Sequence, residues 1–172
     1  MSKAFTVAPG SASGSASVAL IPFAELESPV LQNVFAAWQE WRGSGAMPPR
    51  EKLSLRRLGN ALKYISLARV LDDGVDYEFR TIGDAHVQAY GTSYQHRRVS
   101  DVITASPKFG RRLKGSYDLV RKSGCAYAFR SEIGWDAPDK RFVLFETCYL
   151  PLGAGRVDHI LNAAVYAPQD RH

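Results

Sequence analysis

The chain has 172 residues, of which 45% are apolar and 23% are charged. This is the composition of a globular domain that can bury a core without disulfides or metals. No apolar run approaches the roughly 20 residues that span a bilayer. The N-terminus also lacks the basic start and apolar stretch of a secretory signal. We therefore expect a cytoplasmic protein without a membrane partner.

The net charge of +5 is small for a protein that binds nucleic acid. One stretch is denser in basic residues, and it can present either a surface for phosphates or an ordinary solvated helix face. The pattern favours the solvated face, so nucleic acid is not an expected partner. The stretch contains Arg111, Arg112, Lys114, Arg121 and Lys122, broken by Asp118.

Residues 1–27 are rich in Ala, Ser and Gly and are expected to form a flexible tail. A helix is predicted over 28–45, because Ser28 is a good N-cap and Pro29 suits the first helical position. Its aromatic stripe packs either on the parent domain or across a dimer interface. We expect a homodimer, with an interface formed by Leu31, Phe35, Trp38 and Trp41.

The next predicted elements are a short helix with Leu55, Leu58 and Leu62 on one face, then a β-hairpin. Its strands, 66–71 and 75–82, flank the turn signal Asp72-Asp73-Gly74. In the second strand, Val75, Tyr77 and Phe79 alternate with polar residues.

A helical segment is predicted over 84–122. It begins with a short helix that ends at Tyr90-Gly91, continues through a brief turn at 101–103, and ends in the longest helix, between Ser106-Pro107 and Gly124. Three strands, 126–133, 141–150 and 157–167, then form an antiparallel meander. The stripe of the long helix consists of Phe109, Leu113, Tyr117 and Val120.

These elements predict an α+β fold: a five-stranded antiparallel sheet with helices on one face and an extra N-terminal amphipathic helix. Residues 46–172 form the domain, and the segment 84–122 covers one face of the sheet. A cavity between that segment and the sheet is the natural place for a ligand.

Four short motifs accompany this order of elements: Trp38 and Trp41, Pro48 and Arg50, Arg80-Thr81-Ile82-Gly83, and Leu150-Pro151-Leu152. Together with these motifs, the order of hairpin, helical segment and meander resembles a PAS domain. It is more specifically similar to the small single-domain PAS-like family of alphaproteobacteria, over residues 30–167. One departure is that His96 stands where the family often has the second glycine of a Gly-x-x-x-x-Gly run that begins here at Gly91. The resemblance implies sensing or protein interaction without catalysis.

Several side chains could bind a ligand in this fold. Aromatic residues of the hairpin and the helical segment either line a central pocket or form ordinary core. Arg80 could hold an anion, or it could pair with a neighbouring acid. His86 would be the axial ligand if haem were bound, although no cofactor or metal is expected. The candidate ligand-binding residues are Phe79, Arg80, His86, Tyr90, Tyr94, Phe109, Tyr117 and Phe129.

The sequence contains no Ser/His/Asp arrangement, HExxH motif or Gly-rich phosphate loop at usable spacing. We therefore expect a non-catalytic regulatory module that binds a small molecule, a signalling protein, or both. The alternative is a small α+β-barrel isomerase or dehydratase with one acid–base residue in an apolar pocket. Cys125 and Cys148 are expected to be free thiols, with a redox-formed disulfide as the alternative.

Overall fold

The computed structural model describes residues 18–169, with the backbone alone for Val18 and residues 132–135. The fold is α+β, with one antiparallel sheet of six strands in the order β1-β4-β5-β6-β2-β3. The strands are β1 (Val18–Ile21), β2 (Ile65–Leu71), β3 (Asp76–Ile82), β4 (Tyr127–Asp136), β5 (Phe142–Leu152) and β6 (His159–Pro168). The helices are α1 (Pro29–Arg42), α2 (Leu55–Leu58), α3 (Asp84–Tyr90), α4 (Val99–Ala105) and α5 (Pro107–Ser123).

The predicted hairpin and the predicted meander are both confirmed. Strands β2 and β3 pair antiparallel across the Asp72–Gly74 turn, and β4, β5 and β6 form the meander. The last strand then pairs with the first strand of the hairpin, which places Ser66 opposite Asn162. This pairing joins the two halves of the chain into one sheet.

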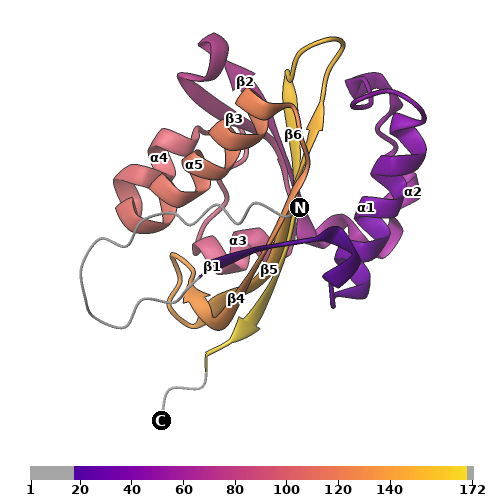
Figure 1. The fold of residues 1–172 in the computed structure, drawn as a ribbon. Helices are drawn as coiled ribbons and strands as arrows, with labels where there is room; N and C mark the ends of the chain where they lie inside the picture. The colour runs from indigo at the N-terminus through magenta and orange to yellow at the C-terminus, as the bar shows by residue number, and fades with distance from the viewer. Residues whose placement is uncertain (1–17, 170–172) are drawn as a thin grey trace.

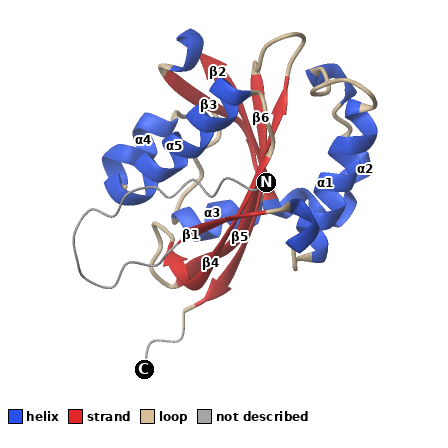
Figure 2. Ribbon diagram, viewed as in Figure 1, coloured by secondary structure: helices blue, strands red, loops and turns tan. Residues whose placement is uncertain are grey.

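Helices cover both faces of this sheet (Figures 1 and 2). Helices α3, α4 and α5 lie on one face, whereas α1 and α2 lie on the other. The expectation of helices on one face was therefore too simple, and the sheet is the middle of three layers. The reason lies in β5, where Tyr149 faces the α5 side and both Cys148 and Leu150 face α1. A sheet with two apolar faces needs cover on each.

The sixth strand was not predicted. Strand β1 lies within the segment 1–27 that was expected to be a flexible tail, and it pairs with residues 128–131 of β4. A short 3₁₀ turn, Phe23–Glu25, then leads to α1. The prediction is thus wrong for residues 18–27, while residues 1–17 lie outside the described part of the chain.

Both long helices begin as predicted, and α5 also ends as predicted, whereas α1 ends at Arg42, before the expected residue 45. Ser28 Oγ accepts a hydrogen bond from the Leu31 amide at 3.4 Å, and α5 ends at Gly124, which has a left-handed φ of 66°. Helix α4 is a full helix where only a turn was expected, because the Asp101 carboxylate caps it by accepting the Arg98 amide at 2.9 Å.

Helix α1 uses its apolar stripe inside the chain. Leu31 and Trp38 are buried, and Trp38 Nε1 donates to the Pro151 carbonyl at 2.9 Å. These two residues are therefore not available to the predicted dimer interface. Phe35 and Trp41 are only partly buried, so they are the members of the predicted interface that reach the surface.

His96 keeps the conformation that favours glycine. Its φ is 62°, and its amide donates to the Phe79 carbonyl at 2.7 Å. A neighbouring bond, from the Phe79 amide to the Arg97 carbonyl at 2.9 Å, fixes the same loop to the outer edge of β3. His96 therefore adopts a left-handed conformation that glycine adopts more readily.

Candidate functional site

Most of the predicted ligand-binding residues come together between the sheet and helices α3–α5. Ring centroids of Phe79 and Tyr90 lie 6.4 Å apart, and those of Tyr90 and Phe109 lie 5.3 Å apart. Tyr94 lies 5.9 Å from Tyr90. These rings meet mostly edge to face, an arrangement that adds to their burial energy. We call the buried residues on this face the aromatic core.

Tyr149 links the remaining predicted aromatics to this core. Its ring lies 5.5 Å from Tyr117 and 6.0 Å from Phe129. Arg80, in contrast, is exposed, and its guanidinium donates to Glu78 at 2.9 Å. Arg80 therefore lies outside this group of residues, because the alternation of β3 directs Arg80 away from Phe79, and its pairing with Glu78 is the alternative that the sequence left open.

His86 is completely buried beside the aromatic core. Its Nε2 lies 2.8 Å from the Tyr64 carbonyl, and a carbonyl can only accept, so Nε2 carries the proton. Nδ1 then accepts from the Tyr166 hydroxyl at 3.0 Å. Burial lowers the pKa of His86 to about 4, opposed in part by the bond to Tyr64. A haem iron would have to displace one of these two bonds.

We predict that His86 makes folding pH-dependent. Its folded pKa of about 4 lies below the ordinary value of 6.5, so unfolded chains bind the extra proton between these two pH values. Stability from this group is present above pH 6.5 and falls by about 3 kcal/mol as the pH falls toward 4. Urea unfolding from pH 7.5 to 4.5 should show a smaller loss for H86Q. The exposed-site control H96Q should follow the wild type, and an H86Q curve parallel to wild type would contradict the assignment.

Tyrosine hydroxyls from four elements converge next to His86. Burial raises the pKa of Tyr90 on α3, Tyr117 on α5, Tyr149 on β5 and Tyr166 on β6. The pKa values of Tyr90 and Tyr166 are raised further by the electrostatic effect of Tyr117 and Tyr149. All four are neutral at physiological pH.

The sheet beneath these hydroxyls is polar. Ser66 on β2, Asn162 on β6 and Tyr149 on β5 form one row across three adjacent strands. Asn162 Nδ2 donates to the Thr147 hydroxyl at 2.8 Å and to the Cys148 carbonyl at 2.9 Å. The centre of the site is therefore a group of converging polar atoms inside an apolar core, which is typical of ligand-binding sites.

Two of these polar atoms lack a partner. The hydroxyls of Tyr117 and Ser66 are buried, and neither has a hydrogen-bond partner among the described residues. The two hydroxyls lie beside each other, because a side-chain interaction of hydrogen-bond type with Ser66 opposes the rise that burial causes in the pKa of Tyr117, although the pair does not reach normal hydrogen-bond geometry. A buried hydroxyl without a hydrogen bond is destabilising by about 1–3 kcal/mol. The pair is therefore the feature of this core that packing alone does not explain.

Carboxylates stay outside the aromatic core in the described part of the chain. Asp76 Oδ2 accepts from the Ser100 hydroxyl at 2.6 Å, at the start of α4. Asp118 accepts from the Tyr77 hydroxyl at 2.6 Å and pairs with Lys114 at 2.9 Å. No group of three or more His, Cys, Asp or Glu that could hold a metal occurs among the described residues.

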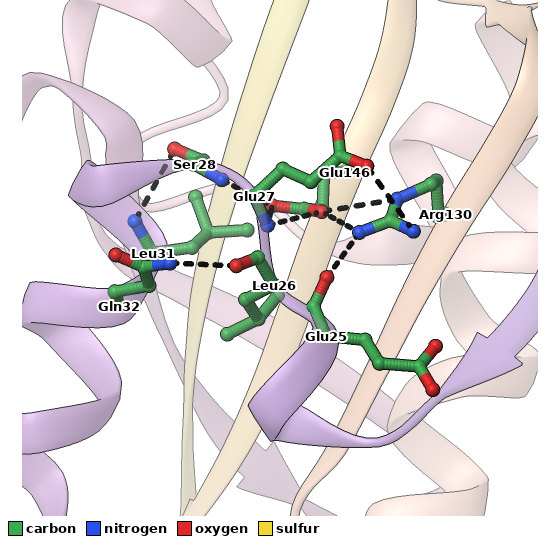
Figure 3. A network of polar contacts seen from close by, with 8 residues as sticks. All are labelled: Glu25, Leu26, Glu27, Ser28, Leu31, Gln32, Arg130 and Glu146. Atoms are coloured by element: carbon green, nitrogen blue, oxygen red, sulfur yellow. Dashed lines mark hydrogen bonds and ion pairs between the residues drawn. The ribbon is translucent and has the colours of Figure 1, made fainter.

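Glu146, the most deeply buried carboxylate of the described residues, lies on the opposite face at the start of α1 (Figure 3). Its oxygens accept the Glu27 amide at 3.0 Å, the Ser28 amide at 2.9 Å and Arg130 at 2.9 Å. Arg130 also donates to the Glu25 carbonyl. This network, which we call the Glu146 clasp, fixes the segment between β1 and α1 to the sheet and has no group free for chemistry.

The two cysteines lie apart. Cys148 is buried on the α1 face opposite Ala128, whereas Cys125 is exposed, and both are free thiols. Burial raises the pKa of Cys148 to about 12, so it is protonated and unreactive. The alternative of a disulfide between them is not supported.

Sequence reasoning missed Tyr149, Tyr166 and Ser66. The signal available was alternation, since Tyr149 and Phe129 both point to the α5 face.

No family model, curated protein or solved structure matches the chain. No helix among the described residues is both long and apolar enough to cross a membrane.

Proposed function

We propose that the chain is a non-catalytic, PAS-like regulatory module that binds a small molecule between α5 and the sheet and passes the signal to a protein partner. The observation that carries this proposal is the group of hydroxyls that β2, β5, β6, α3 and α5 contribute to the face of the sheet covered by α5. Five elements supply polar atoms to this face, so a ligand bound there would couple to most of the domain.

The element order supports the PAS-like part of the proposal. Strands β2 and β3, helices α3–α5 and strands β4–β6 follow one another as the resemblance implies. The five strands β2–β6 are contiguous in the sheet, and β1 is added outside them next to β4. The helical segment covers the face of the sheet on which the hydroxyls converge.

One observation favours the alternative, an isomerase or dehydratase. His86 is a titratable group with a lowered pKa in largely aromatic surroundings, as an acid–base residue of such an enzyme would be. Against it, both ring nitrogens already have partners within the chain. A regulatory module does not need a side chain that is free to exchange a proton with a substrate, so we prefer the regulatory proposal.

Native mass spectrometry tests ligand binding. The purified protein would be incubated with a small-molecule extract of bacterial cytosol, desalted and measured intact. We expect a discrete adduct that disappears when the same sample is measured after acid denaturation, since a non-covalent ligand leaves the unfolded chain. Only the bare chain mass under both conditions would contradict the binding proposal.

The homodimer remains a prediction, with a narrower interface than the sequence suggested. We expect light scattering coupled to size exclusion to give a dimer at micromolar concentration, and W41A to shift it toward monomer. W38F serves as the control: it loses the bond to Pro151 and should lower the melting temperature while leaving the dimer intact. A monomeric wild type would contradict the prediction.

A further inference from the structure

We infer that the ligand of this site is a small, uncharged, mostly apolar molecule with a hydroxyl or amide group, anchored by the hydroxyls of Tyr117 and Ser66. This inference rests on the proposed function and specifies the class of ligand. It follows from three observations: the charge state of the site, its unpaired polar atoms, and the size of the residues on the sheet beneath it.

The site offers no compensation for a charged ligand. The buried charged residues of the described chain are Asp76 and Glu146, and both are engaged elsewhere, at the start of α4 and in the Glu146 clasp. His86 is neutral, as are the tyrosines. An isolated charge is costly to bury without an opposite charge. An uncharged ligand avoids this cost.

The unpaired hydroxyls specify a hydrogen-bonding group. Other polar groups of the site are satisfied: His86 by Tyr64 and Tyr166, and the Asn162 amide by Thr147 and Cys148. Tyr117 and Ser66, from α5 and β2, lie beside each other without a hydrogen bond of normal geometry, so hydrogen-bonding capacity remains between the two hydroxyls. A ligand hydroxyl or amide placed between them would give both a partner.

Small residues lie beside the polar row of Ser66, Asn162 and Tyr149 on this face of the sheet. Ala68 follows Ser66 on β2, and Ala164 of β6 lies opposite Thr147 of β5. Two tyrosines on this face have their hydroxyls inside the fold: that of Tyr117 is buried, and that of Tyr166 donates to the buried His86 at 3.0 Å. Rotation of such rings away from small residues makes room for an apolar ligand body without moving the sheet.

Three probes of one shape test the inference by calorimetry at pH 7. We expect p-cresol to bind with one site per chain, toluene to bind at least about threefold more weakly because it lacks the hydroxyl, and 4-methylbenzoate not to bind. Binding of 4-methylbenzoate as tight as that of p-cresol, or no binding of p-cresol, would overturn the inference. If either of these results overturned the inference, an adduct in the native mass spectrum would still support the proposed function, because it shows ligand binding without specifying the ligand class.

Two variants test the anchor. Y117F and S66A should each weaken p-cresol binding about three- to tenfold. Each should also raise the melting temperature of the free protein by about 2–4 °C, because a buried hydroxyl without a partner is removed. S131A is the matched control: Ser131 is also buried with an unpaired hydroxyl, but it lies opposite Val18 at the other edge. It should raise the melting temperature and leave binding unchanged. If both Y117F and S66A bound p-cresol with wild-type affinity, these hydroxyls would not be the groups that anchor the ligand.

Discussion

Replacing Glu146 with glutamine should destabilise the fold by about 3–5 kcal/mol, the cost of breaking a buried ion pair on one side. The carboxylate accepts two backbone amides and the Arg130 guanidinium, and all of these are donors. A glutamine amide has one oxygen to accept them, and its NH₂ group would face donors. Arg130 would also keep its charge at a site where its side chain is only 20% exposed.

Urea unfolding at pH 7 measures the loss, and hydrogen exchange locates it. Exchange should accelerate most at the amides of Glu27 and Ser28 and along β1, because the Glu146 clasp fixes the segment that joins β1 to α1. The control is E40Q. Glu40 also pairs with an arginine, Arg57, but it is exposed, so its loss should change stability far less than the loss of Glu146. Equal effects of E146Q and E40Q would contradict the role given to the clasp.

The sequence was most informative where a signal lies at each end of an element. Ser28-Pro29 and Gly43 bound α1, and Ser106-Pro107 and Gly124 bound α5. These signals are local, since a cap is defined by the few residues around it. The hairpin was predicted for a similar reason, because its turn residues sit between two apolar runs.

Pairings between distant parts of the chain left no comparable signal. Strand β1 has four residues, and its partner β4 lies more than a hundred residues later. Glu146 looks like an exposed strand residue until the Glu27 and Ser28 amides are placed against it. The second covered face was missed because β5 and β6 are apolar on both sides, and alternation then no longer tells which side faces a helix.

The candidate site was half predictable for the same reason. Phe79, Tyr90, Tyr94, Phe109 and Tyr117 belong to the hairpin and the amphipathic helices, where periodicity identifies the buried side. The polar row beneath them depends on the registers of β2 with β6 and of β6 with β5, and a shift of one residue would turn each side chain to the other face. Only the structure fixes these registers, and with them the position of Ser66 below Tyr117.

Replacing Gly83 with alanine should destabilise the protein by about 3 kcal/mol, near the upper end for an overpacked site. Gly83 has an ordinary φ of −76°, so its backbone conformation would suit alanine. The obstacle is space: an added Cβ would lie 2.5 Å from the carbonyl oxygens of both Leu62 and Lys63. These oxygens belong to a backbone turn that leads into β2, and they cannot move without moving the neighbouring Tyr64 carbonyl.

The consequence should extend to the candidate site, because Tyr64 is the acceptor for His86. In G83A, an NMR titration should show the His86 pKa moving up from about 4 toward its ordinary value, as a displaced turn admits solvent. The matched control is G115A. Gly115 lies inside α5 with nothing within 4 Å of an added Cβ, so alanine there should stabilise the protein by up to about 1 kcal/mol. If G83A proved as stable as wild type, the close approach of α3 to this turn would not be what positions His86.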